Sequence, residues 1–182
     1  MSTRSVEVVV LCEDLQQEVF VRRFLQRRGC ERFLFQPPIS PAGRGSGEHW
    51  VRGRFPRELQ AHRSQAARRN TWLLVVTDAD TRTVQDRVQG FARACEEADV
   101  PLRRPGEKVI FVIPRRNIET WFAYLREEVV NETETYPRHD CENDCRDEVR
   151  RLDELCRQQQ LEPQPPPPSL VTACTEFQRV AQ

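Results

Sequence analysis

Three short apolar segments separated by helix-like segments predict an α/β fold with a mainly parallel sheet flanked by helices. The apolar segments are Val6–Cys12, Trp72–Thr77 and Val109–Pro114, and each is rich in β-branched or aromatic residues with little alternation of polar and apolar positions. Strands that are covered on both faces have this composition. Because apolar residues recur every three or four positions between these segments, we predict helical connections with right-handed crossovers.

The remaining elements are less strongly marked. Four glycines and three prolines favour a loop after the second predicted strand. In chain order, the weaker elements are a strand over Arg32–Gln36, a loop over Pro37–Gly53, and helices over Pro56–Arg69, Asp144–Gln160 and Ser169–Val180. We divide the chain into an α/β domain over residues 1–126 and a helical, acidic and proline-rich extension over residues 127–182 that packs on the same domain.

Charge is unevenly distributed along a chain of 182 residues in which 28 basic and 28 acidic residues cancel. Residues 22–69 contain twelve arginines and three glutamates, whereas residues 127–154 contain eleven acids and four arginines. Each block is either a solvated face or a binding surface. As binding surfaces, the basic block would bind an anion, and the acidic block would bind a basic partner or fold back on the basic block. The chain has no P-loop, nucleophile elbow or dinucleotide-binding glycine motif, which argues against an ATPase, a triad hydrolase and a dinucleotide enzyme.

The cysteines and the N-terminus indicate an intracellular protein. No segment resembles a signal peptide or a membrane span, so we expect a cytoplasmic chain whose seven cysteines are reduced and which does not enter a membrane. A zinc site built from His139, Cys141, Cys145 and Cys156 is an alternative use of four of these positions. Their spacing fits no standard zinc motif, which makes that the weaker hypothesis.

Acidic residues follow each of the three strong strands. Glu13 follows the first, Asp78 and Asp80 follow the second, and Glu119 lies shortly after the third. The carboxyl ends of parallel strands meet at one edge of a sheet, where ligands usually bind. Clustered carboxylates repel one another unless a cation neutralises them, and hard divalent cations prefer oxygen ligands. The sequence therefore predicts a Mg²⁺ or Mn²⁺ site at this edge.

Two further groups of residues are candidates for the same site. Glu18 is a weaker metal ligand, because a solvent-exposed helix glutamate explains it equally well. The competing interpretation is that each acid, considered alone, is a helix N-cap and not a metal ligand. Helix caps are expected at the positions of Glu13, Asp14 and Asp78. Arginines that could bind nucleic-acid phosphates are Arg44, Arg52, Arg54, Arg57, Arg115 and Arg116.

The acids and their flanking strands resemble a known family. The segments Val8–Glu13 and Leu74–Asp80 are similar to the glutamate and Asp-x-Asp motifs of the TOPRIM fold, which is Rossmann-like. The stretch Val112–Trp121 is similar to a segment of small stand-alone TOPRIM proteins of the RloB-like and OLD-type kinds, which occur in bacterial defence operons. The resemblance covers residues 6–126, and it departs from the family pattern where Asp14 and Thr81 replace glycines.

The resemblance implies a Mg²⁺- or Mn²⁺-dependent endonuclease acting on nucleic acid. In this family, the residue matching Glu13 serves as general acid/base or ligand, and those matching Asp78 and Asp80 hold the metal. The resemblance also implies an anti-phage effector that works with a separate ABC- or AAA-type ATPase, for which the acidic block is a candidate docking surface. The alternative is a catalytically silent subunit that keeps the fold and recruits nucleic acid or the ATPase.

Overall fold

The computed structural model describes residues 6–36, 47–137, 145–158 and 165–181, which build a sheet of parallel strands. The order across the sheet is β2-β1-β3-β4. The strands are β1 (Glu7–Leu11), β2 (Arg32–Phe35), β3 (Thr71–Val76) and β4 (Val109–Val112). This arrangement confirms the predicted α/β class and is Rossmann-like.

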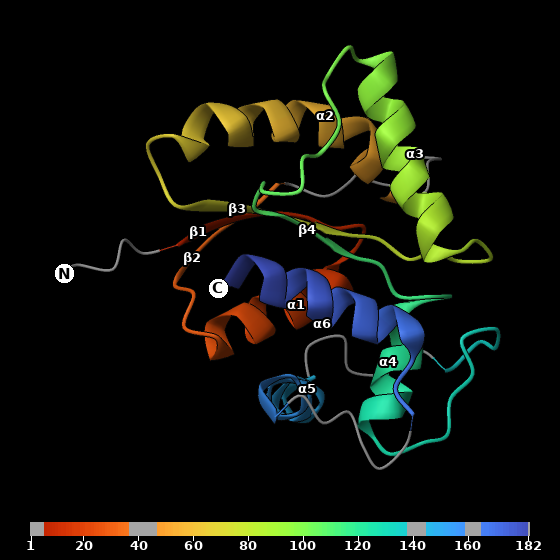
Figure 1. Ribbon diagram of the computed structural model, residues 1–182. Helices are drawn as coiled ribbons and strands as arrows, with labels where there is room; N and C mark the ends of the chain where they lie inside the picture. The colour runs from red at the N-terminus through yellow and green to blue at the C-terminus, as the bar shows by residue number, and fades with distance from the viewer. Residues whose placement is uncertain (1–5, 37–46, 138–144, 159–164, 182) are drawn as a thin grey trace.

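Helices cover both faces of the sheet (Figure 1). On one face lie α2 (Gly47–Ala66) and α3 (Val84–Glu97); on the other lie α1 (Leu15–Arg27), α4 (Ile118–Leu125), α5 (Arg146–Gln158) and α6 (Pro168–Ala181). Every residue of β3 is buried, and its side chains alternate between two apolar cores: Trp72 and Leu74 join the α1 side, while Leu73 and Val75 join the α2 side. The absence of polar alternation in the sequence has this origin.

The second helix is longer than the sequence predicts. We expected a loop over Pro37–Gly53 and a helix that starts at Pro56, but residues 47–53 are already helical and Pro56 lies inside α2. Proline is unfavourable in a helix interior because it removes a backbone hydrogen bond. The buried side chains of Val51, Phe55 and Leu59 lie four residues apart and pack on the sheet, and this apolar stripe outweighs the proline. Residues 37–46 lie outside the described part of the chain.

The strand order places a switch point between β1 and β3. From β1 the chain passes through α1 to β2 at one edge, and it then crosses through α2 on the opposite face to β3 on the other side of β1. Crevices at such points, beyond the carboxyl ends of the strands, are where open α/β sheets bind ligands. Glu13 and Asp78 follow the two strands that flank this point.

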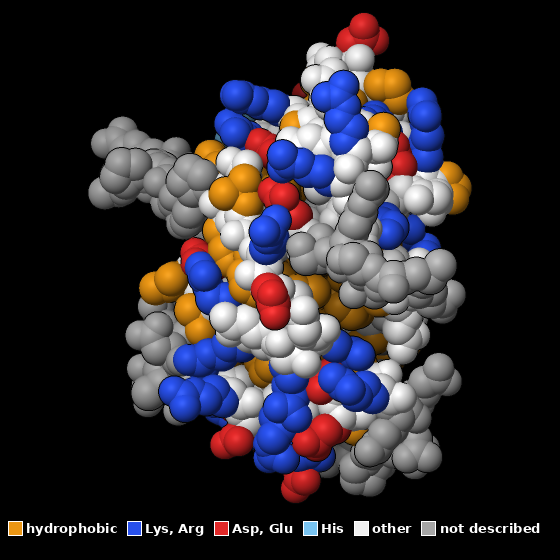
Figure 2. All heavy atoms as spheres, turned by 90° about the vertical axis from the view of Figure 1, so that its left-hand side faces the viewer, with side chains coloured by type: hydrophobic (Ala, Val, Ile, Leu, Met, Phe, Trp, Pro, Cys, Tyr) orange, Lys and Arg blue, Asp and Glu red, His pale blue; other side chains and the backbone are white. Residues whose placement is uncertain are grey.

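The acidic block folds back on the first helix. Asp153 of α5 is almost fully buried; its Oδ2 accepts from Arg27 Nε at 3.1 Å, and its Oδ1 lies 2.9 Å from Arg28 Nε in an ion pair. Glu148 pairs with Arg126 at 2.6 Å. Part of the acidic charge is therefore paired within the chain, so these two acids are not open for a docking partner. On the end of the molecule where the strands begin, Lys and Arg side chains lie at several places on the surface (Figure 2).

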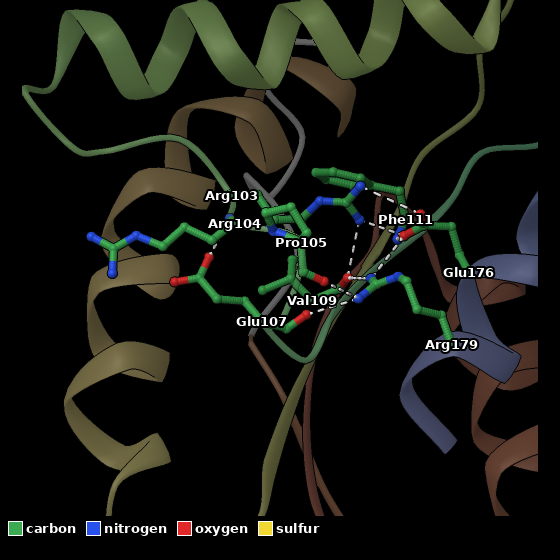
Figure 3. Close-up of polar contacts among 8 residues, drawn as sticks. All are labelled: Arg103, Arg104, Pro105, Glu107, Val109, Phe111, Glu176 and Arg179. Atoms are coloured by element: carbon green, nitrogen blue, oxygen red, sulfur yellow. Dashed lines mark hydrogen bonds and ion pairs between the residues drawn. The ribbon is translucent and has the colours of Figure 1, made fainter. Parts of the chain in front are cut away.

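The C-terminal helix protects the exposed edge of β4 (Figure 3). Val109 O accepts from Arg103 Nη1 at 3.1 Å and from Arg179 Nη2 at 2.7 Å, and Phe111 N lies 3.5 Å from Glu176 Oε2. Unpaired backbone groups at a strand edge can pair with another chain and cause aggregation. Here side chains form hydrogen bonds with the backbone groups that a fifth strand would otherwise bind. Residues of α5 and α6 also belong to the apolar core that covers the α1 side of the sheet. In the described residues, no helix is long and apolar enough to cross a membrane.

Candidate metal centre

Glu13 reaches from the end of β1 to the end of β3. Its Oε1 accepts a hydrogen bond from Asp78 N at 3.0 Å and another from Thr77 Oγ1. Gln17 Oε1 accepts from Glu13 N at 3.0 Å and fixes the backbone of the residue. Burial raises the pKa of Glu13 to about 7, although the two hydrogen bonds and the charge of Arg87 act in the opposite direction. The carboxyl group is therefore close to half ionised at neutral pH.

Asp78 carries a buried oxygen without a partner. Its Oδ1 is inaccessible to solvent and accepts no hydrogen bond from any described residue. Burial raises the pKa of Asp78 well above its ordinary value, and the negative charges of Glu13, Asp14 and Glu119 add to the effect. Glu119 lies in the first turn of α4 and is itself buried. An orphaned carboxylate oxygen among other acids is destabilising unless a proton or a metal cation neutralises the group.

Asp80 does not join this pair, because its carboxylate is bound by Arg87 of α3. Arg87 Nη2 lies 2.6 Å from Asp80 Oδ2, Nε donates to Asp78 O at 2.9 Å, and Nη1 lies 3.0 Å from Glu48 Oε1. The guanidinium group thus links the end of β3 to the start of α2. Asp80 adopts a left-handed conformation with φ of 54°, and its side chain is 64% exposed.

The start of α2 lies directly against Glu13. A Cβ atom built on Gly47 would be 2.7 Å from Glu13 Cβ and 2.9 Å from Glu13 O. Only glycine allows the helix to approach the β1–α1 turn this closely. The first backbone N–H groups of a helix also favour negative charge nearby, so α2 contributes to the electrostatics of the acidic edge.

Two acids near the first strand have structural roles. Asp14 is the N-cap of α1, and its Oδ1 accepts a hydrogen bond from Gln17 N at 2.9 Å. The backbone of Asp14 is extended, with a φ of −147° that any residue adopts. The cap interpretation is therefore confirmed for Asp14. Glu18 forms an ion pair with Arg22 one turn further along α1. The structure does not bring Glu18 into hydrogen-bonding contact with Asp78.

The candidate phosphate-binding arginines do not form one track. Arg54 pairs with Glu58 at 2.8 Å, whereas Arg52 pairs with Glu48 at 3.0 Å and lines a hollow between α2 and α3 together with Arg82, Arg87 and Arg93. Arg57 is exposed on α2. Arg44 lies outside the described residues.

The two arginines after β4 contribute mainly through their backbone. Arg116 O accepts from Asp80 N at 2.9 Å, so this turn abuts the acidic edge. The guanidinium of Arg116 donates to Thr135 Oγ1 at 2.8 Å. Arg115 N donates to Ser169 Oγ at 3.1 Å.

Neither metal hypothesis is met by a ready-made set of three protein ligands. Among residues 6–36, 47–137, 145–158 and 165–181, no three His, Cys, Asp or Glu side chains form a group that could hold a metal ion. For zinc, His139 and Cys141 lie outside the described residues, and the Cys156 thiol instead lies 2.6 Å from that of Cys174. The two-carboxylate arrangement of Glu13 and Asp78 nevertheless fits Mg²⁺, which usually keeps several waters and binds one or two carboxylates together with substrate phosphates.

Three residues of the centre were missed by reasoning from the sequence. Thr77 and Arg87 hold Glu13, Asp80 and the β3 turn, and Gly47 permits the approach of α2. Arg87 could have been predicted from the sequence. It lies seven residues after Asp80, and a short turn followed by the first turn of a helix spans that separation, so its side chain can reach back to the end of the strand. Comparison with protein-family models, curated proteins and solved structures gives no significant match to this chain.

Proposed function

We propose that the chain is a divalent-metal-dependent nuclease of TOPRIM type, in which Glu13 and Asp78 hold the metal. The observation that carries the proposal is the buried Asp78 Oδ1, which has no hydrogen-bond partner among the described residues, in a residue whose backbone N–H donates to the Glu13 carboxylate at the switch point of the sheet. Burial raises the pKa of both groups, the negative charge of Asp80 adds to the rise at Glu13, and that of Glu13 adds to the rise at Asp78; a divalent cation would offset this repulsion. Glu119 lies close enough to Asp78 to add to the negative potential.

A bound Mg²⁺ or Mn²⁺ would polarise a phosphodiester and stabilise charge on the leaving oxygen. The residues of the chain supply the rest. In the alternative role, in which Asp78 holds the metal and Glu13 does not ligate it, Glu13 would accept a proton from the attacking water; burial raises the pKa of Glu13 to about 7 without metal. Arg87 holds the Asp80 carboxylate and the Asp78 carbonyl, and it keeps the β3 turn in place. The hollow between α2 and α3 is lined by Glu48, Asp86 and Glu97 as well as by arginines, and of these Arg82 and Arg93 are candidate cations for the nucleic-acid backbone next to this turn.

A second candidate function is a catalytically silent subunit that binds nucleic acid or an ATPase. The pairing of Asp80 with Arg87 favours it, because the second acid of the Asp-x-Asp motif is then taken by an arginine. Both candidates are compatible with an anti-phage system that includes a separate ABC- or AAA-type ATPase. The silent subunit would bind metal and nucleic acid but leave the nucleic acid intact.

Cleavage of plasmid DNA, single-stranded DNA and RNA in Mg²⁺, Mn²⁺ or EDTA tests the proposal. We expect metal-dependent cutting that falls by about 10² to 10⁴ in Glu13→Gln, since this is the range for loss of a general base. Asp78→Asn should also lose cutting, whereas Glu96→Gln, which removes an exposed carboxylate on α3, should retain it. Metal binding without cutting would favour the silent subunit. If Glu13→Gln and Asp78→Asn both keep the cutting activity and the metal binding of the unchanged protein, both candidate functions are contradicted.

A further inference from the structure

A second polar site lies at the opposite end of the sheet, where the strands begin. A hollow of about 600 Å³ is enclosed by the end of α2, the turn into β3 and the loop before β4. This volume is within the range of small-molecule sites, which is about 300 to 1,000 Å³. Strands of four to six residues put about 13 to 20 Å between this hollow and the acidic edge. The hollow is therefore separate from the metal centre.

The lining of the hollow is strongly cationic. Arg63, Arg68, Arg69, Arg104 and Lys108 all line it, and Glu107 is the acid among its described lining residues. We call this hollow the basic pocket.

The charge of Glu107 is already neutralised. Arg63 Nε lies 2.6 Å from Glu107 Oε1 and Arg63 Nη2 lies 3.0 Å from Oε2. Arg104 N donates to the same Oε2 at 2.8 Å. Arg63 also donates to the carbonyls of Pro101 and Leu102, both at 2.8 Å. Arg63 and Glu107 thus neutralise each other. Their ion pair forms part of the wall of the basic pocket and adds no net charge to it.

The other cations of the pocket have weak or neutral partners. Lys108 Nζ donates to the uncharged Asn70 Oδ1 at 2.8 Å, and Arg69 lies 3.5 Å from Glu7 with a side chain that is 65% exposed. The exposed side chains of Arg68 and Arg104 form no ion pair with another described residue. In Figure 3 the Arg104 guanidinium extends away from the contacts drawn around it. An excess of positive charge therefore surrounds the hollow.

The loop that carries Arg104 and Lys108 is fixed from behind by α6. Arg179 Nη1 donates to Pro105 O and to Glu107 O, both at 3.1 Å, while its Nη2 donates to Val109 O at 2.7 Å (Figure 3). None of the Arg179 contacts depends on a ligand. One wall of the basic pocket is thus held in place before a ligand arrives, which reduces the entropy lost on binding.

We propose that the basic pocket binds the phosphate groups of a nucleotide ligand. Guanidinium groups bind phosphate through paired hydrogen bonds, and Lys adds a point charge, so Arg68, Arg69, Arg104 and Lys108 form a phosphate-binding set. The phosphates belong either to a free nucleoside triphosphate or to a nucleic-acid backbone. Binding here does not depend on the metal centre or on cleavage.

Binding of ATP and of a 12-nucleotide oligothymidylate, measured by calorimetry in EDTA and low salt, tests this proposal. We expect Arg68→Ala/Arg104→Ala to weaken binding at least tenfold. The control Arg150→Ala/Arg157→Ala removes equal charge from α5 and should leave binding within twofold. Adenosine, which lacks phosphate, should not bind. Binding of ATP alone identifies a free nucleotide as the source of the phosphates, and binding of the oligonucleotide alone identifies the nucleic-acid backbone.

The acidic edge serves as an internal check on this experiment. Glu13→Gln and Asp78→Asn should bind ATP or the oligonucleotide as the unchanged protein does, even where they lose cutting. Absence of binding of both ligands at millimolar concentration, equal binding by the two double variants, or binding of adenosine would overturn the proposal. None of these results would alter the conclusion about the metal centre.

Discussion

The two ends of the sheet differ in the sign of their charge and in how that charge is solvated. At the carboxyl ends of the strands, Glu13 and Asp78 are held close together and partly buried, and Asp78 Oδ1 has no hydrogen-bond partner in the part of the chain that the structure describes. At the opposite end, Arg68 and Arg104 are exposed around an open hollow. A net charge of zero thus conceals an acidic end and a basic end of one domain.

The two ends of the sheet therefore affect the stability of the fold differently. Burial of like charges opposes folding, because each carboxylate loses water and repels the other. Exposed arginines keep their hydration, so a cationic hollow has little effect on stability. The acidic end is therefore expected to be destabilising without metal, and the basic end to be nearly neutral. The predictions below test this contrast, in order of decreasing expected effect.

The largest expected effect is a pH dependence of stability that comes from Glu13. Burial raises the pKa of Glu13 from 4.5 to about 7, so the folded state binds this proton more tightly than the unfolded state. The stabilisation is complete below pH 4.5 and is lost as the pH rises through 7, with an upper limit of about 3 kcal/mol. Urea unfolding at pH 5 and pH 7.5 in EDTA should show this loss.

Glu13→Gln isolates that contribution from the other titrating groups. The difference in the free energy of unfolding between the variant and the unchanged protein should move in favour of the variant as the pH rises. Mg²⁺ at pH 7.5 should stabilise the unchanged protein and leave the variant nearly unaffected. Parallel pH profiles for the two proteins would mean that the Glu13 carboxyl is not destabilised by burial.

A smaller effect is expected where α2 approaches the acidic end. Gly47→Ala places a Cβ against Glu13, and overpacking of this kind costs about 1 to 3 kcal/mol. Gly53→Ala lies in the same helix with no atom within 4 Å of the new Cβ, so it should stabilise by about 0.5 to 1 kcal/mol. Opposite signs in urea unfolding are the expected result. Equal shifts in the two variants would show that the close approach is absent.

The smallest effect concerns the wall of the basic pocket. Arg179→Ala removes three hydrogen bonds to backbone carbonyls and should lower the free energy of unfolding by about 1 kcal/mol. It should also weaken ATP binding, although Arg179 is not among the residues that line the pocket. Thr175→Ala, at an exposed position of α6 whose hydroxyl bonds only within the helix, should change neither property. Unchanged ATP binding in Arg179→Ala would show that the loop is fixed by other contacts.

The sheet was predictable because its chemistry is local. Buried parallel strands need unbroken apolar runs, and β3 has one from Trp72 to Val76 that the structure confirms. The start of α2 was not predictable, because Pro56 favours a helix start in isolation and only the packing of Val51, Phe55 and Leu59 on the sheet overrides it. Tertiary burial thus outweighed a local signal.

The candidate site was predictable in its position and less so in its contacts. Parallel topology alone brings Glu13 and Asp78 to one edge, and the structure places them in contact. Arg87 forms an ion pair with the Asp80 carboxylate and so keeps it away from Glu13 and Asp78. This pairing depends on the angle at which α3 leaves the β3 turn, which no sequence pattern specifies. The basic pocket was missed because its arginines are spread between residues 63 and 104 and meet only in the folded chain.

Direct measurement of Mn²⁺ binding tests the central claim, that Glu13 and Asp78 hold the metal and Asp80 does not. Electron paramagnetic resonance at pH 7.5 should show Mn²⁺ bound by the unchanged protein and by Asp80→Asn, with affinities within about threefold of each other. Asp78→Asn should bind at least tenfold more weakly, since it loses the negative charge of the carboxylate that carries the unpartnered oxygen. Loss of binding in Asp80→Asn with binding kept in Asp78→Asn, or no binding by the unchanged protein at millimolar Mn²⁺, would contradict the account.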